Sequence, residues 1–187
     1  MQKMKKGEYG YIKSQKKWIG AKTALLFLVS LSLYLSGYIT TGSNRNLLTI
    51  VAVLGCLPAS KSAVNLIMFL RAKGCKEELR EKIAAHAGML PALYDCVITT
   101  YESAFEIPHM VFRGNNLVGI TVDPKCKPAA CEKHLLEMCG RNGIKDVNVK
   151  IFTDVAKYQN RLDQLQALSC EDTQTEAALA LVKALSI

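Results

Sequence analysis

Two long apolar segments near the N-terminus dominate the pattern of hydrophobic and polar positions. Between Lys22 and Arg45 the chain has 22 uncharged residues, and the stretch 24–39 is almost wholly apolar. A helix needs ~20 apolar residues to cross the hydrocarbon core of a bilayer. The first segment therefore predicts a membrane-spanning helix over about 19–39.

The second apolar segment covers residues 47–70, and its 24 residues are interrupted by Pro58 and Lys61. A helix of that length reaches ~36 Å at ~1.5 Å per residue, so the segment can cross as one bent helix. The connector 40–46 is rich in turn residues. We therefore expect a helical hairpin of two spans with a short external loop.

Aromatic residues lie near the ends of the first segment. Trp18 precedes it, and Tyr34 and Tyr38 fall toward its other end, where rings favour the membrane–water interface. A secretory signal peptide also combines a basic start with an apolar run. The run here is longer than the apolar core of a typical signal peptide, no A-x-A-like cleavage site follows it, and a second apolar segment begins soon after, so an uncleaved span is favoured.

Small and ionisable residues mark the second segment. Gly55, Ala59 and Ala63 recur at every fourth position and predict a stripe for close helix packing. Lys61 has two interpretations. Its ammonium group can extend toward the headgroups, which is favoured, or it can form a buried ion pair or a transport site.

Beyond Arg71 the pattern changes to short alternating elements. Helical spacing predicts four helices, and runs of β-formers predict four strands. We expect helices at 75–89, 126–140, 154–168 and 172–185, and strands at 94–101, 106–113, 117–122 and 146–152. The expected fold class is an α/β (α+β) domain over 71–187 with the order helix, three strands, helix, strand, helix, helix.

The formal net charge of +8 lies in and beside the apolar segments. Seven lysines and one glutamate fall before residue 23, whereas 15 basic and 15 acidic residues follow from Arg71 onward. The positive-inside rule then places the basic tail 1–18 and the domain 71–187 in the cytoplasm, beneath an inner or plasma membrane. Because the domain carries no net charge, no nucleic-acid partner is favoured.

The predicted element order and two short motifs resemble restriction-endonuclease-like nucleases, including membrane-associated nuclease-related (NERD-type) domains, over about 75–155. The motifs are Glu106-Ile-Pro-His before a hairpin and Asp123-Pro-Lys125 after it. The resemblance implies that Glu106 and Asp123 would hold Mg²⁺ and that Lys125 would orient the attacking water. Pro108 stands where the family carries an aspartate, so the resemblance implies a degenerate site.

Other chemistry has little support in the sequence. Asp123-Pro-Lys125 is also typical of a turn that ends a strand. Cys126, Cys131, Cys139 and His134 are zinc-ligand types, but their spacing lacks a C-x-x-C pair. The sequence contains no Walker, dinucleotide-binding, serine-hydrolase or zincin motif.

These patterns together favour a non-enzymatic membrane protein. We expect two spans in the lipid bilayer and a cytoplasmic α/β domain that binds a protein partner or a second copy of the chain, as an interaction or regulatory module. No cofactor is expected for that role. The alternative is a membrane-anchored nuclease-like hydrolase with a degenerate site, in which Glu106 and Asp123 would hold Mg²⁺ and Lys125 would orient the attacking water.

Overall fold

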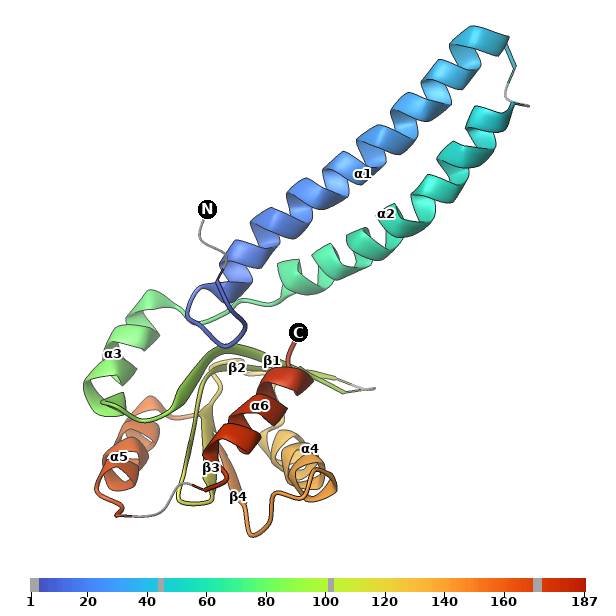
Figure 1. Ribbon diagram of the computed structural model, residues 1–187. Helices are drawn as coiled ribbons and strands as arrows, with labels where there is room; N and C mark the ends of the chain where they lie inside the picture. Colours follow the sequence, from blue (N-terminus) through green and yellow to red (C-terminus); the bar gives the residue numbers. More distant parts are fainter. Residues whose placement is uncertain (1–3, 44–45, 101–102, 170–172) are drawn as a thin grey trace. The chain divides into compact units, whose positions relative to one another are not determined.

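The computed structural model describes residues 4–43, 46–100, 103–169 and 173–187 (Figure 1). The chain divides into two compact units: Met1–Ile12 together with Lys73–Ile187, and Lys13–Ala72. The expected division was a tail at 1–18, spans at 19–70 and a domain at 71–187. The N-terminal residues up to Ile12 instead join the domain, because Ile12 is 1% exposed and packs within it.

The unit Lys13–Ala72 consists of two long helices. Helix α1 covers Tyr11–Thr41 and helix α2 covers Leu47–Arg71. Both are long and apolar enough to cross a membrane. Helix α1 begins well before the span expected at 19–39, because the lysine-rich and glutamine-containing segment 11–18 has good helix formers. Arg45 of the connector lies outside the described residues.

Helices α1 and α2 pack against each other in an antiparallel register. The hydroxyls of Thr23 and Ser62 are 2.7 Å apart and hydrogen-bond to each other. A Cβ atom added at Gly55 would lie 2.9 Å from Ser30 Oγ, so these two positions are in close contact. Another close approach joins Gly37 to Leu48 near the connector. Small residues at these points let the helix backbones come close together.

The contact stripe of α2 differs in part from the predicted one. Among the residues of the predicted stripe, Ala59 is 0% exposed, whereas Gly55 and Ala63 are both half-buried. The buried position near Ala63 is Ser62. The buried residues of α2 are Ala52, Ala59, Ser62 and Phe69, which are seven, three and seven positions apart. This spacing is close to a heptad pattern, which keeps the buried positions facing a neighbouring helix.

The domain contains a four-stranded mixed sheet in the order β1-β2-β3-β4. Its strands are β1 (Ala92–Thr99), β2 (Ala104–Arg113), β3 (Asn116–Ile120) and β4 (Asn148–Phe152). Strands β1, β2 and β3 form an antiparallel meander, and β4 pairs parallel to β3. Gly114 and Asn115 both have positive φ in the two-residue turn between β2 and β3, which suits the twist of a hairpin.

Two helices cover each face of the sheet (Figure 1). The helices of the domain are α3 (Glu77–Ala87), α4 (Pro128–Arg141), α5 (Val155–Gln166) and α6 (Thr175–Leu185). Helices α4 and α6 enclose one apolar core, and α3 and α5 enclose the other. The α+β class is confirmed. Residue 172, where the last helix was expected to begin, lies outside the described residues.

Strands β1 and β2 change the faces of their side chains at one point. Asp95 of β1 has φ 55° and lies opposite Pro108 of β2 in the register. Ile107 and Met110 consequently enter the same core although they are three residues apart. A positive φ interrupts the two-residue alternation of a strand, and proline offers no N–H to the ladder. The pair therefore forms a kink across both strands.

Other parts of the chain cover both edges of the sheet. On β1, Tyr94 N–H donates to the Gly7 carbonyl at 2.8 Å, and Val97 N–H donates to Ser186 Oγ at 2.9 Å. On β4, Ile151 N–H donates to Glu132 Oε1 at 2.9 Å. Occupied edge groups cannot pair with a strand of another chain. At these positions the edge N–H groups already have partners within the chain.

The hairpin contacts predict different effects at two neighbouring alanines. Ala59→Leu inserts a large side chain at a fully buried position and should destabilise the hairpin by ~1–3 kcal/mol. Ala63→Leu is the matched control, because Ala63 is only half-buried and should tolerate the change better. Denaturation of the full chain in detergent, followed by circular dichroism, measures both. Equal effects would contradict the packing described above.

Candidate functional site

The carboxylate of Asp95 joins the two segments that bracket the helical hairpin. Its Oδ1 accepts a hydrogen bond from Cys75 N–H at 2.6 Å, and its Oδ2 accepts one from Ile12 N–H at 3.4 Å. Ile12 is the second residue of α1, and Cys75 lies four residues beyond the end of α2. The segments that enter and leave the hairpin are therefore held at one side chain, which we call the Asp95 anchor.

The Asp95 anchor also caps α1. The first N–H groups of a helix lack partners within the helix, and the residue before α1 is Gly10, which has no side chain to cap them. Asp95 supplies the acceptor from β1, and its negative charge suits a helix N-terminus. Asp95 itself is 4% exposed, so these hydrogen bonds offset the cost of burying a carboxylate.

Gly74 allows the approach of the second segment to Asp95. It has φ 71°, and a Cβ atom at this position would lie 3.1 Å from Asp95 Oδ1. Any other residue would adopt this backbone conformation at a cost and would crowd the carboxylate. Glycine at position 74 is thus part of the anchor geometry.

Aromatic rings extend the anchor from the N-terminal segment into the core. Tyr9 contacts Tyr94 edge-on with ring centroids 6.0 Å apart, and the Arg80 guanidinium lies 4.4 Å above the Tyr9 ring. The Tyr9 hydroxyl donates to the Glu77 carboxylate, which raises the pKa of Tyr9 to about 12. Glu77 also pairs with Arg80 at 2.8 Å. These contacts fasten the N-terminal segment to α3 and β1.

Behind Tyr94 lies a buried histidine. His109 of β2 is 0% exposed, its ring lies 4.6 Å from that of Tyr94, and its Nδ1 is 2.7 Å from the hydroxyl of Tyr158 on α5. Burial lowers the pKa of His109 to about 4. His109 Nε2 has no hydrogen-bond partner among the described residues. At neutral pH this imidazole is uncharged and serves as a packed core group.

The thiol of Cys75 does not have the properties of a nucleophile. Burial, with a smaller contribution from the Asp95 carboxylate, raises the pKa of Cys75 to about 12. A reactive cysteine needs a lowered pKa, because the thiolate is the attacking species. The anchor therefore holds chain segments together through hydrogen bonds to the Asp95 carboxylate, and the Cys75 thiol beside it is not activated.

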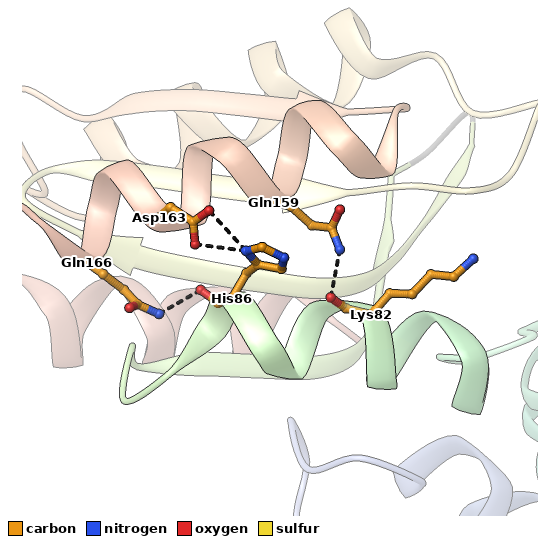
Figure 2. A network of polar contacts seen from close by, with 5 residues as sticks. All are labelled: Lys82, His86, Gln159, Asp163 and Gln166. Atoms are coloured by element: carbon orange, nitrogen blue, oxygen red, sulfur yellow. Dashed lines mark hydrogen bonds and ion pairs between the residues drawn. The ribbon is translucent and has the colours of Figure 1, made fainter.

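Helix α3, which follows the anchor, is fixed to α5 by three polar contacts (Figure 2). Gln159 Nε2 donates to the Lys82 carbonyl at 2.8 Å, and Gln166 Nε2 donates to the His86 carbonyl at 2.6 Å. Between them, His86 Nδ1 lies 2.9 Å from Asp163 Oδ1. The three α5 residues share one face of that helix. The contacts hold α3 in place, so the segment that leaves the hairpin ends in a fixed helix.

The residues of the nuclease-like hypothesis lie at one end of the sheet. Glu106 is in β2, and Asp123 lies in the turn after β3, where its Oδ1 accepts a hydrogen bond from Lys125 N–H at 3.3 Å. Both carboxylates contribute to the raised pKa of the Cys126 thiol. Among the described residues, no three His, Cys, Asp or Glu side chains converge to hold a metal ion. Asp123 is engaged in its own turn.

The cysteines proposed as zinc ligands occupy other surroundings. Cys131 and Cys139 are buried in the core beneath α4, and Cys126 packs partly against that core. Burial raises the pKa of all three thiols. Within the part of the chain that the structure describes, the cysteines act as small apolar core residues.

The residues predicted to face the membrane lie on the outer surface of the hairpin. Trp18 is 62% exposed, Tyr38 and Lys61 are exposed, and Tyr34 is half-buried. The sequence pattern alone did not identify Asp95 as a structural residue. The available signal was the broken alternation around Pro108, which marks the kink opposite Asp95.

Comparison of the chain with family models, curated proteins and solved structures gave no match.

Two substitutions of Asp95 should separate the contribution of its hydrogen bonds to stability from that of its backbone conformation. Asp95→Ala removes the acceptor for two buried N–H groups and places alanine at positive φ, so we expect a loss of ~2–4 kcal/mol in unfolding free energy. Asp95→Asn keeps one acceptor oxygen and tolerates positive φ, so the loss should be smaller. Urea denaturation of the full chain in detergent measures both.

Asp146 provides the matched control for Asp95. It has φ 56° and lies in an exposed turn. Asp146→Ala should therefore cost only the ~1 kcal/mol expected for alanine at positive φ. If Asp95→Ala costs no more than Asp146→Ala, the carboxylate hydrogen bonds do not stabilise the anchor.

The buried His109 should make stability depend on acid pH. Its pKa is about 4 in the folded chain and 6.5 when exposed, so between these values the unfolded chain binds more protons. The stabilisation is complete above the exposed pKa and is lost as pH falls toward the folded one. From pH ~7 to ~4.5 the unfolding free energy should fall by about 2–3 kcal/mol through this residue.

His109→Phe isolates that contribution, because His86 and His134 are present in both chains. Denaturation midpoints of the two chains are measured across this pH range in detergent. The variant should show a flatter pH dependence. Parallel curves for the two chains would show that the pKa of His109 does not differ between the folded and unfolded states.

Proposed function

We propose that the chain is a two-span integral membrane protein whose α+β domain acts as a membrane-anchored interaction or regulatory module. Its termini and domain face the cytoplasm beneath an inner or plasma membrane. The proposal rests on the hairpin, the charge distribution and the Asp95 anchor. Each supports a different part of it.

The single observation that carries the membrane assignment is the inverted polarity of the hairpin. Polar residues Thr23, Ser30 and Ser62 are buried between the helices, whereas large apolar side chains such as Leu28 and Leu57 are exposed. In water this surface would be an aggregation liability, since contiguous exposed apolar patches mark contact with lipid or protein. In a bilayer the same surface is stable, and small polar residues are common between packed spans.

The charges support the orientation. The lysine-rich start of α1 and the basic residues Arg71, Lys73 and Lys76 flank the ends opposite the connector, whereas Arg45 is the sole basic residue of the connector sequence 40–46. The positive-inside rule then assigns those ends to the cytoplasm. Lys61 is exposed on α2, ten residues before Arg71, and its ammonium can extend toward the cytoplasmic headgroups.

The Asp95 anchor supports the module assignment. Both segments that bracket the hairpin end at one carboxylate, so a displacement of one relative to the other would break a hydrogen bond in the domain. The covered edges of the sheet argue against recruitment of a partner by strand addition. A partner would instead contact helices or loops of the domain.

Topology labelling tests the membrane assignment. A membrane-impermeant maleimide is applied to intact cells that carry the parent chain or one of two variants. Ser43→Cys places a cysteine in the connector, and Lys133→Cys places one at an exposed position of α4. The labelling of each variant is compared with that of the parent chain. We expect extra labelling for Ser43→Cys only, and for both after permeabilisation. Native Cys139 is 1% exposed and cannot serve as the reporter. Labelling of Lys133→Cys from outside would overturn the orientation.

The assembly state tests the module against the enzyme alternative. Chain extracted with its native lipids should migrate as a complex larger than the purified 20.6 kDa chain. The full chain should also leave DNA and RNA uncut in the presence of Mg²⁺ or Mn²⁺. Cleavage that Asp123→Ala abolishes would instead support the nuclease-like site at Glu106, Asp123 and Lys125, because such a reaction needs metal-binding carboxylates.

A further inference from the structure

We propose that the basic start of α1 is a binding surface for anionic phospholipid headgroups. The inference rests on the proposed membrane insertion of the hairpin, and it adds a lipid preference that insertion alone does not require. We call the surface the lysine collar and define it by Lys13, Lys17 and Lys22. These three side chains are exposed on α1.

An exposed tryptophan lies next to the lysine collar. Trp18 is 62% exposed and lies between Lys17 and Lys22 in the sequence of α1. An exposed tryptophan favours the headgroup level of a bilayer, which places the neighbouring ammonium groups at the depth of the lipid phosphates. The antiparallel register that pairs Thr23 with Ser62 also sets the exposed Arg71 of α2 near the level of Ser14.

No carboxylate within the hairpin competes for the lysine collar. The sequence from Tyr9 to Lys76 contains no aspartate or glutamate. Within this stretch Lys13, Lys17 and Lys22 have no acidic residue to pair with. An anionic phospholipid offers a phosphate at the matching depth, and basic residues next to a span attract such lipids.

The single tryptophan of the chain makes the lysine collar directly measurable. The full chain is reconstituted in phosphatidylcholine vesicles that contain phosphatidylglycerol. Either the phosphatidylglycerol or an equal mole fraction of the phosphatidylcholine is brominated near the headgroup end of its acyl chains. Bromine quenches the fluorescence of Trp18 on contact, so the ratio of the two quenching efficiencies reports which lipid is enriched beside the lysine collar.

We expect brominated phosphatidylglycerol to quench at least about two-fold more than brominated phosphatidylcholine, and the ratio to fall as salt is raised. The triple variant Lys13→Gln, Lys17→Gln, Lys22→Gln should quench equally with both lipids. The charge-matched control Lys127→Gln, Lys133→Gln, Lys157→Gln changes exposed lysines of the domain and should keep the wild-type ratio.

The remaining outcomes overturn the inference in distinguishable ways. Equal quenching by both lipids in the wild-type chain would refute the lipid preference while leaving membrane insertion supported. A preference that persists in the triple variant would refute the assignment to the lysine collar. Absence of quenching by either lipid would refute insertion itself, and with it the proposed function.

Discussion

The arrangement of the domain depends on one buried carboxylate with two backbone donors. Asp95 accepts hydrogen bonds from Ile12 and Cys75, which lie 83 and 20 residues from it in sequence. A carboxylate buried without such donors would be costly, and two N–H groups at these positions without an acceptor would be costly as well. The positive φ of Asp95 allows these hydrogen bonds, because it takes the side chain out of the regular alternation of β1. The kink opposite Pro108 is therefore the local cause of a long-range connection.

The sequence predicted the elements well where the pattern of apolar positions is regular. The two apolar helices, the hairpin turn at Gly114 and Asn115 and the α+β class follow from length, periodicity and turn residues. Prediction failed where tertiary contacts determine the outcome. Ile107, Met110 and Phe112 do not follow a strict two-residue alternation, yet all three side chains enter the same core. This irregular spacing marks the point where β2 and its neighbour β1 both turn their side chains to the other face of the sheet. No single-sequence pattern identifies Asp95 as the partner of residues on both sides of the hairpin.

The packing stripe of α2 illustrates the same limit on a smaller scale. A repeat of four selects Gly55, Ala59 and Ala63, of which Ala59 is buried and the other two are half-buried, whereas Ser62 lies outside that repeat and is buried. Small size alone suggested Ala63, whereas the observed seam follows a spacing near 3.5 residues. Ser62 is buried because its hydroxyl has a partner in Thr23, and that pairing depends on the register of α1. Of the two interpretations of Asp123-Pro-Lys125, the turn agrees with the hydrogen bond from Lys125 N–H to Asp123 Oδ1.

The hairpin is an insertion in the domain rather than an anchor that precedes it. Residues up to Ile12 supply a carbonyl to β1 through Gly7, a ring to Tyr94 through Tyr9 and a buried side chain at Ile12. A chain that began at Gly74 would lose all three and would expose the β1 edge at Tyr94. An inserted hairpin has both of its ends fixed to one structure, so a change in their separation must be absorbed by Asp95, Gly74 or the helix α3 that follows. A simple N-terminal anchor has one attachment to its domain and lacks this property. The double attachment is the feature on which the regulatory part of the proposed function rests.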